Sequence, residues 1–248
     1  MENIDCIYIL NLKKERNRLK QCLMSLADEE IYIPIKIYPG TYWDSEYFKN
    51  NIHEKKIIYS KKWQENGNKI KSGQIACCYS HLELLNDARK NNYKTILLLQ
   101  DDVYCKNIGE IKNEIEKYHN LIKKYNDFDL YYIGREKISN EDEIKFQDTE
   151  YIIPKYSWNA HSVIFSRKCI DKLLSTQIYN NIIPFDEFLP LCYGESGCEN
   201  IEYFIKLFPK IINAVSTDEY NKIYQVTYNS SRYKKLINEY SISDIDNS

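Results

Sequence analysis

The chain has 248 residues, and its 34 Lys and Arg against 36 Asp and Glu give a net charge of −2. This length is enough to bury a core without disulfide support, and the near-neutral charge provides no global field that would attract nucleic acid or an anionic membrane. Charged residues make up 28% and aromatic residues 14% of the sequence, which is typical of a globular protein.

The eight cysteines are scattered and form no C-x-x-C pair, so the sequence does not indicate a zinc site. Whether Cys192 and Cys198 form a disulfide stays open, as does the oligomeric state. The chain begins with the strand-like run "IDCIYILNL" and contains no apolar run near the length of about 20 residues that a membrane helix needs. We therefore expect no membrane span.

The first part of the chain alternates strand and helix patterns. A buried strand is predicted over residues 6–12, and apolar residues at helical spacing predict a helix over 13–27. Residues 31–40 predict a second strand, and Pro34 makes it an edge or irregular strand. Residues 41–72 are polar and aromatic with weak periodicity, and a long excursion of this kind is usually functional or partly mobile.

The alternation continues through the middle of the chain. Ser72-Gly73 opens a predicted helix over 74–90, and the apolar run "TILLLQ" over 95–100 predicts the next strand. An amphipathic helix is predicted over 107–125, and another buried strand over 127–135.

The last part of the chain has weaker patterns. Residues 137–150 are acidic and polar and predict an exposed loop, whereas 157–175 predict a strand followed by a helix that begins near Ser166. A short helix is predicted over 184–195 and a weak strand over 209–215.

This order of elements predicts an α/β fold, an open sheet with helices on both faces. We expect one domain over residues 1–235, followed by a polar tail over 236–248. In such sheets, ligands bind beyond the carboxyl ends of the strands. Three predicted strands end in polar groups: Asn11, Asp101-Asp102 and Gly134-Arg135.

The adjacent carboxylates of Asp101-Asp102 end the most apolar of these strands. Either one, left dry and unpaired, would cost several kcal/mol, so something must offset their charge. A hard divalent cation such as Mg²⁺ or Mn²⁺ prefers oxygen ligands and leaves positions for phosphate oxygens. The alternative is that one Asp caps the next turn and the other faces solvent.

Other polar residues allow two interpretations each. Asp186-Glu187 follow Pro184 at a helix start, where the helix dipole alone favours acidic side chains. Arg135 is either a clamp for a diphosphate or a partner in a surface salt bridge. Ser80-His81 lie in mid-helix among apolar neighbours, where a lone His is more often a core residue than a base.

Together these segments resemble glycosyltransferase family 25. "IYILNLKKERNR" is similar to the opening strand of the family, "GQIACCYSHLELL" to its Ser-His helix, and "ILLLQDDV" to its Glu-Asp-Asp segment. "DFDLYYIGREK", "YSWNAHSVIFSRKCIDKLL" and "IPFDEFLPL" resemble the procollagen galactosyltransferase branch. The resemblance covers residues 4 to 195, with the six segments in matching order.

The resemblance implies a GT-A fold, a Rossmann-like open mixed sheet that binds a nucleotide-sugar. It also implies an inverting, Mn²⁺-dependent hexosyltransferase that moves galactose, or glucose, from a UDP-sugar donor to hydroxylysine of a collagen-like protein. The alternatives are a family 25 enzyme with a glycolipid or other glycan acceptor, and a catalytically silent module that binds nucleotide-sugar or collagen. No nucleic-acid partner is expected.

The resemblance also implies roles for individual residues. Asp101 and Asp102 are expected to bind the metal, and Asp186 is the expected catalytic base, with Glu187 as the second choice. The residues expected to contact the nucleotide or the donor sugar are Asn11, Arg16, Arg18, Ser80, His81 and Arg135.

The sequence departs from the family in places. Gln100 stands where the family has Glu, which removes one negative charge, and Ala76 replaces a Gly of the helix motif. After "FPKII" we find no equivalent of the acidic Ser-Asp-Thr-Glu stretch, and "YQVTYNSS" stands in its place. Since no signal peptide or retention tail is present, the chain as written is expected to be cytoplasmic, or an excised domain of a secretory-pathway or viral enzyme.

Overall fold

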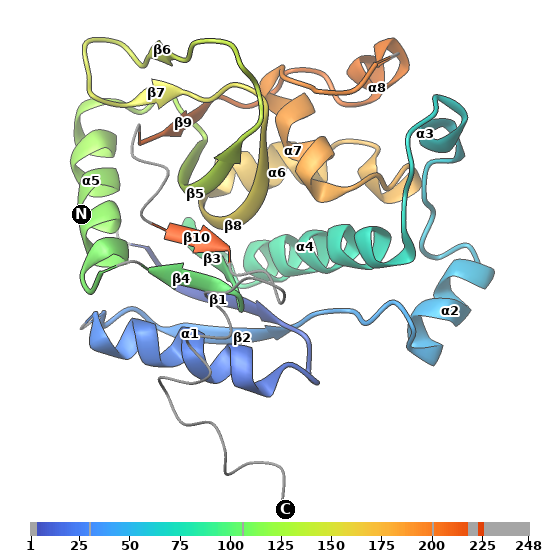
Figure 1. The fold of residues 1–248 in the computed structure, drawn as a ribbon, viewed down its shortest axis with the longest axis horizontal. Helices are drawn as coiled ribbons and strands as arrows, with labels where there is room; N and C mark the ends of the chain where they lie inside the picture. Colours follow the sequence, from blue (N-terminus) through green and yellow to red (C-terminus); the bar gives the residue numbers. More distant parts are fainter. Residues whose placement is uncertain (1–3, 30, 106, 200, 218–222, 226–248) are drawn as a thin grey trace, which may run out of the picture.

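The structure, a computed structural model, describes residues 4–29, 31–105, 107–199, 201–217 and 223–225 (Figure 1). The strands are β1 (Cys6–Asn11), β2 (Ile35–Pro39), β3 (Thr95–Gln100), β4 (Val103–Cys105), β5 (Leu130–Lys137), β6 (Ile144–Lys145), β7 (Ile152–Ile153), β8 (Ser157–Ser166), β9 (Ala214–Ser216) and β10 (Ile223–Gln225). Eight of them form one mixed sheet in the order β2-β1-β3-β8-β5-β9-β7-β6, while β4 and β10 pair separately.

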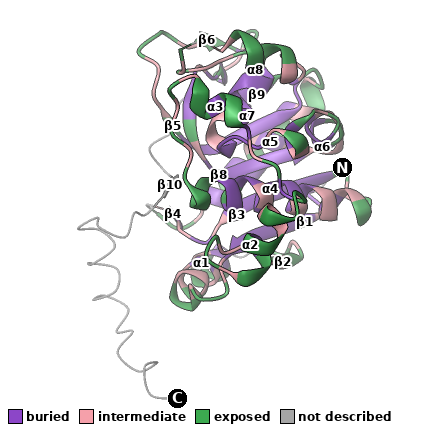
Figure 2. Cartoon of the chain, turned by 90° about the vertical axis from the view of Figure 1, so that its right-hand side faces the viewer, coloured by how far each residue is buried: buried purple, intermediate pink, exposed green. Residues whose placement is uncertain are grey.

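Helices cover both faces of the large sheet. They are α1 (Arg16–Asp28), α2 (Glu46–His53), α3 (Lys61–Glu65), α4 (Ser72–Lys90), α5 (Glu110–Lys124), α6 (Arg167–Leu174), α7 (Phe185–Tyr193) and α8 (Glu202–Leu207), with a 3-10 turn over Ile178–Asn180. Because side chains alternate along a strand, Tyr8 of β1 packs into the core beneath α4, α6 and α7, whereas Ile7 and Ile9 pack beneath α1 and α5. Figure 2 shows the central strands buried between helices that carry exposed residues.

This architecture confirms the predicted α/β fold class, an open mixed sheet with helices on both faces. As Pro34 suggests, β2 stands at one end of the strand order. The predicted helix start at Ser166 is also confirmed, because its hydroxyl accepts a hydrogen bond from the Cys169 amide and caps α6.

Two stretches hold more structure than the sequence indicates. The excursion over 41–72 contains α2 and α3, which are capped by the hydroxyls of Ser45 and Ser60. The stretch over 137–150, predicted as a loop, contains β6, whose two residues pair with β7. The polar tail predicted over 236–248 lies outside the described residues.

The strand directions bring one set of ends together. β1, β2 and β3 are mutually parallel, and β5 runs in the same direction because each of β3 and β5 is antiparallel to β8. The carboxyl ends of β1, β3 and β5 therefore lie along one edge of the sheet, together with the start of β8. This edge is where the polar strand ends of the sequence are expected to meet.

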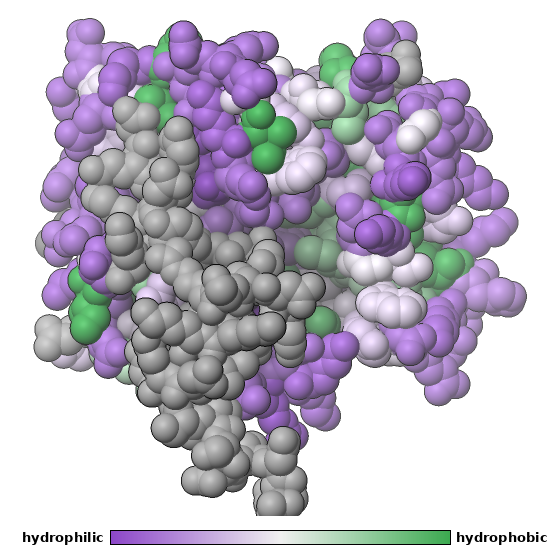
Figure 3. All heavy atoms as spheres, in the orientation of Figure 1, coloured by the Kyte–Doolittle hydropathy of each residue, from purple (hydrophilic) through white to green (hydrophobic). Residues whose placement is uncertain are grey.

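The remaining features of the fold concern the surface, the character of the helices and the state of the cysteines. The face in Figure 3 is mostly hydrophilic and is hollowed over α4. Among the described residues, none of the helices combines the length and apolar character needed to cross a membrane. All eight cysteines are free thiols, so Cys192 and Cys198 are not paired.

Candidate active site

Two carboxylates at the end of β3 are held by residues of the first strand and helix. The guanidinium of Arg18, in the first turn of α1, forms ion pairs with Asp101 and with Asp102, where the distance to Oδ2 is 2.7 Å. Asn11, the last residue of β1, donates through Nδ2 to Asp101 Oδ2 at 2.6 Å. The structure thus brings together four residues that the sequence points to separately.

Arg18 offsets part of the charge that the sequence leaves unexplained. Asp101 is only 5% exposed, and burial raises its pKa to about 6 although Arg18 and Asn11 oppose the shift. One guanidinium against two carboxylates leaves a net charge of −1 at this point when both carboxylates are ionised. The cluster therefore still favours a cation.

The residues present fit a hard divalent cation. Adjacent Asp carboxylates supply only oxygen ligands, the donors that Mg²⁺ and Mn²⁺ prefer. Across the described ranges, no three His, Cys, Asp or Glu side chains form a metal-binding group, so this part of the chain would offer the cation Asp101 and Asp102. Cations that bind together with nucleotide phosphates usually have this sparse protein coordination.

A cavity of about 210 Å³ opens beside the carboxylate pair. It lies at the carboxyl ends of β1, β2 and β3, the position where ligands bind in open α/β sheets. The residues that line it are Leu10, Leu12, Arg18, Gly40, Thr41, Tyr42, Trp43, Gly73, Ala76, Cys77, Ser80, Gln100 and Asp101. Its walls therefore come from β1, the segment after β2, and α4.

Two aromatic rings in this wall were not predicted individually. Tyr42 and Trp43 lie with ring centroids 5.8 Å apart, and the Lys14 ammonium lies 4.0 Å from the Tyr42 centroid. The wall stays close to β1 because Gly40 has no side chain; a Cβ there would approach Leu12 Cδ2 to 3.2 Å. The aromatic composition of residues 41–72 was the signal that could have identified these rings.

Ser80 fastens this wall to α4. Its Oγ accepts a hydrogen bond from the Thr41 amide at 2.7 Å and donates to the Ala76 carbonyl at 2.7 Å. Ser80 also lines the cavity. It therefore supports the predicted nucleotide site, and its hydroxyl is already engaged with the backbone.

His81 lies behind the cavity and has no exposed surface. Burial lowers its pKa to about 4, so the imidazole is neutral. Its Nδ1 donates to the Cys77 carbonyl at 2.8 Å, which leaves Nε2 to accept from the Gln100 amide nitrogen at 3.4 Å. The ring stacks on Phe185 with centroids 4.2 Å apart. His81 thus contacts both Gln100 and Phe185, the residues immediately before Asp101 and Asp186. It positions these two residues rather than contacting a ligand.

Asp186 holds an irregular part of β8. Between the register pairs Gly134↔Ser162 and Glu136↔Trp158, β8 has two residues more than β5, so this bulge leaves backbone amides without ladder partners. Asp186 Oδ1 accepts from the Ala160 amide in the bulge at 3.3 Å. Burial raises the pKa of Asp186, and the charge of Glu136 raises it further. Asp186 is therefore a stronger base than a solvated Asp.

Glu187, the next residue, binds a different set of partners. Its Oε1 accepts from the Tyr156 hydroxyl at 2.8 Å, and its Oε2 accepts from the Cys198 thiol at 3.4 Å. Burial raises the pKa of Glu187 despite these hydrogen bonds. Because both of its oxygens have side-chain partners, Glu187 is less suited than Asp186 to receive a proton from a substrate.

Cys77 on α4 is influenced by the charges of both Asp102 and Asp186. Cys77 is an exposed residue, yet desolvation of its thiol by the neighbouring groups raises the pKa to about 12, and the charges of Asp186 and Asp102 raise it further. Carboxylates from the β3 end and from α7 therefore act on one side chain that lines the cavity. The expected base and one of the expected metal ligands thus both lie within electrostatic range of Cys77.

Two predicted arginines lie apart from the carboxylate pair. Arg135 has no exposed side-chain surface; it donates to Ser216, Ser157 and Glu143 at 3.0, 2.7 and 2.7 Å. In this conformation it supports the end of β5 from inside the protein. Arg16 is exposed at the first residue of α1, on the same helix as Arg18.

One acidic stretch begins at the end of β9. Ser216-Thr217-Asp218-Glu219 follows "FPKII" and contains the four expected residue types in a different order. Ser216 ends β9 beside Arg135, whereas Asp218 and Glu219 lie outside the described residues. These residues, rather than "YQVTYNSS", are therefore the counterpart of the acidic Ser-Asp-Thr-Glu stretch.

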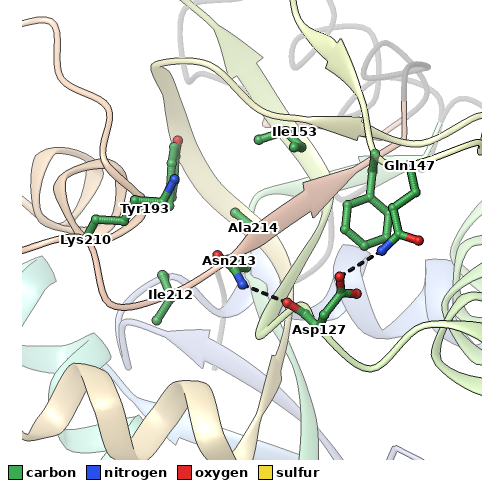
Figure 4. A pocket seen from close by; sticks show the side chains of 9 residues that line it. Asp127, Gln147, Ile153, Tyr193, Lys210, Ile212, Asn213 and Ala214 are labelled. Carbon is green, nitrogen blue, oxygen red and sulfur yellow. Dashed lines mark hydrogen bonds between the residues drawn. The ribbon is translucent and has the colours of Figure 1, made fainter.

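A second cavity, of about 280 Å³, lies at the other end of the sheet, near the first residue of β9 (Figure 4). Its polar groups are largely bonded to one another. Gln147 donates to the Asp127 carboxylate at 2.8 Å, and Asn213 donates to the Asp127 carbonyl at 2.7 Å. None of the residues predicted to be functional lines this cavity, so the first cavity is the candidate active site.

Comparisons with known proteins identify a family for this chain. The sequence model described as "Glycosyltransferase family 25 (LPS biosynthesis protein)" matches residues 4–189. Human "Procollagen galactosyltransferase 2" is 24% identical over 205 residues, which cover 81% of this chain and 32% of that protein. Mouse "Inactive glycosyltransferase 25 family member 3" is 23% identical over 214 residues, covering 86% of this chain and 35% of that protein. The chain thus spans about a third of the length of these relatives.

Solved glycosyltransferase structures share low similarity with the chain. One, described as involved in glycosylation of the major capsid of PBCV-1, is 13% identical with a TM-score of 0.43 and covers 87% of this chain and 82% of its own. The apo form of GlyE from Streptococcus pneumoniae TIGR4 is 12% identical with a TM-score of 0.46, covering 98% of this chain and 61% of its own.

Proposed function

The chain belongs to glycosyltransferase family 25, and from this membership we propose that it is an inverting, metal-dependent hexosyltransferase. We propose that it moves galactose, or glucose, from a UDP-sugar to hydroxylysine of a collagen-like protein. The observation that carries the proposal is the position of the Asp101-Asp102 pair. It adjoins a cavity at the carboxyl ends of the parallel strands, and Asp102 and Asp186 both lie within electrostatic range of Cys77, which lines that cavity.

The cavity has features suited to the donor. The rings of Tyr42 and Trp43 offer flat surfaces on which a nucleobase can stack. Arg18 and Asn11 lie next to the carboxylates and can donate hydrogen bonds toward phosphate oxygens. Mn²⁺, held by Asp101 and Asp102, would offset the negative charge that develops on the UDP leaving group.

Asp186 would serve as the base in transfer with inversion. The acceptor hydroxyl oxygen forms a bond to the anomeric carbon while the bond from that carbon to the UDP oxygen breaks, and the hydroxyl proton moves to the Asp186 carboxylate. The raised pKa of Asp186 supports this role because a more basic carboxylate accepts the proton more readily. His81 would maintain the spacing between the donor residues and the base.

A silent binding module is the second candidate. Arg18 already pairs with both carboxylates, and Gln100 removes one charge that the family has at this point. Relatives named as inactive are among the matches. Under this interpretation the chain would bind the nucleotide-sugar in the cavity without transferring the sugar.

The test is a UDP-release assay with Mn²⁺, in which UDP-galactose and UDP-glucose are offered separately, with and without a hydroxylysine-containing collagen peptide. We expect peptide-dependent release with one donor, and loss of that release in Asp102→Asn but not in Asp148→Asn, an exposed residue of the β6–β7 turn. UDP binding without release would support the silent module. Release that persists in Asp102→Asn would contradict the metal assignment.

A further inference from the structure

An exposed indole and an exposed carboxylate lie side by side next to Asp186. Trp158 of β8 is 43% exposed, and Glu136 of β5 is its register partner across the antiparallel pair. Directly paired residues present their side chains on the same face of a sheet, with Cβ atoms about 5 Å apart. The two side chains therefore form one surface beyond the edge of the sheet.

Hydrogen bonds fix both side chains. The Trp158 indole N–H donates to the Tyr156 hydroxyl at 2.5 Å, and that hydroxyl donates to Glu187. Asn159, in the bulge, has a left-handed backbone with φ of 63°, and its amide donates to Glu136 Oε2 at 2.8 Å. An exposed Trp loses less conformational freedom on binding a ligand when its orientation is already fixed.

This surface carries negative charge that the described residues do not neutralise. Glu136, Asp186 and Glu187 lie together, and within the described ranges their carboxylates accept hydrogen bonds but form no ion pair with Lys or Arg. A cation placed here would meet the face of an indole and a carboxylate at once, and each attracts it. A neutral sugar hydroxyl would gain neither of these attractions.

We propose that Trp158 and Glu136 recognise a protonated amine on the acceptor, adjacent to the hydroxyl that receives the sugar. The inference deepens the proposed function and rests on it, because hydroxylysine carries its ammonium on the carbon next to its hydroxyl. A base for the hydroxyl and a site for the ammonium must then adjoin, as Asp186 and Glu136 do. The negative charge of Glu136 helps to raise the pKa of Asp186, which agrees with this proximity.

The acceptor amine can be neutralised without changing its hydroxyl. We would measure, by calorimetry with UDP and Mn²⁺ present, the affinity of the chain for a hydroxylysine-containing collagen peptide and for the same peptide acetylated on the side-chain amine. A cation–π contact and a partly exposed ion pair together predict about tenfold tighter binding of the free amine. This preference should decline as salt is added.

Variants then assign the preference to the two side chains. Glu136→Gln can keep the hydrogen bond from Asn159 while losing its charge, and Trp158→Leu removes the ring. Each variant should lose one of the two attractions, so its preference for the free amine should fall from about tenfold to about threefold. Trp158→Phe should retain part of the preference, and Asp148→Asn, which loses the same charge at a distant exposed site, should retain all of it.

The outcomes separate this inference from the proposed function. Equal affinity of the wild type for both peptides, or a full preference in Glu136→Gln, would overturn amine recognition even if the chain transfers sugar. A preference that depends on Glu136 and Trp158, found without any release of UDP from either donor, would uphold amine recognition and overturn transfer.

Discussion

Replacing Arg18 with Met tests the cluster at the end of β3 most directly. The variant keeps the aliphatic stem of Arg18 and removes the cation that pairs with Asp101 and Asp102. Breaking a buried ion pair costs about 3–5 kcal/mol, and because the Arg18 side chain is 20% exposed, we expect the lower end, about 3 kcal/mol. For a chain of this length, this corresponds to a fall of about 6–12 °C in the melting temperature at pH 7.

The assay is thermal unfolding followed by circular dichroism, at pH 7 and at pH 5. At pH 5 protonation of Asp101, whose pKa is already raised to about 6, removes the repulsion, so the deficit of the variant should shrink. Arg16→Met is the matched control, since it removes the same charge from an exposed position on the same helix. Added Mn²⁺ should raise the melting temperature of Arg18→Met more than that of the wild type.

Two results would refute this reasoning. If Arg18→Met melts within about 2 °C of Arg16→Met at pH 7, Arg18 does not offset a buried charge. If the deficit is as large at pH 5 as at pH 7, the destabilisation comes from lost packing rather than from unpaired carboxylates.

Three further predictions concern the base, the buried histidine and Asp101. Asp186→Asn retains an oxygen for the Ala160 amide, so it should keep its melting temperature and UDP affinity while sugar transfer falls by about 10²–10⁴-fold; unchanged turnover would eliminate Asp186 as the base. His81→Phe keeps the stack on Phe185 but loses two hydrogen bonds, and urea titration should show a loss of about 1–2 kcal/mol. Because the pKa of His81 is about 4, its replacement should not alter the activity profile between about pH 5 and pH 8, and an altered profile would give His81 a role in proton transfer. Since the pKa of Asp101 lies above its ordinary value of 3.8, at about 6, its contribution to stability should fall as the pH rises from about 4 to about 6, a slope that Asp101→Asn should lack.

Much of the fold follows from hydrophobic patterns in the sequence. The apolar runs that form β1, β3 and β8 are buried on both faces, and such runs are recognisable without any knowledge of their neighbours. The polar residues at the ends of β1 and β3 could be placed near each other because parallel strands align their carboxyl ends. That reasoning correctly brings Asn11 close to Asp101.

The partners of each polar group could not be predicted in this way. Sequence patterns indicate that Asp101-Asp102 need a compensating charge, but Arg18 meets them only because β1 and β3 are parallel neighbours and α1 begins just after β1. His81 has no solvent contact, and this burial depends on the residues that pack around it in the fold. The bulge in β8 depends on register, and a register is a property of two strands rather than of one.

Cys77 gives this site a chemical reporter of its own. Its thiol lines the cavity, and desolvation together with the nearby negative charges raises its pKa to about 12. Because the thiolate is the form that attacks alkylating reagents, the thiol should be modified slowly. A cation bound at Asp102 would favour the thiolate and speed that modification, whereas a nucleotide filling the cavity would block access. The rate of alkylation at one natural side chain would thus distinguish metal binding from nucleotide binding, without a label and without turnover.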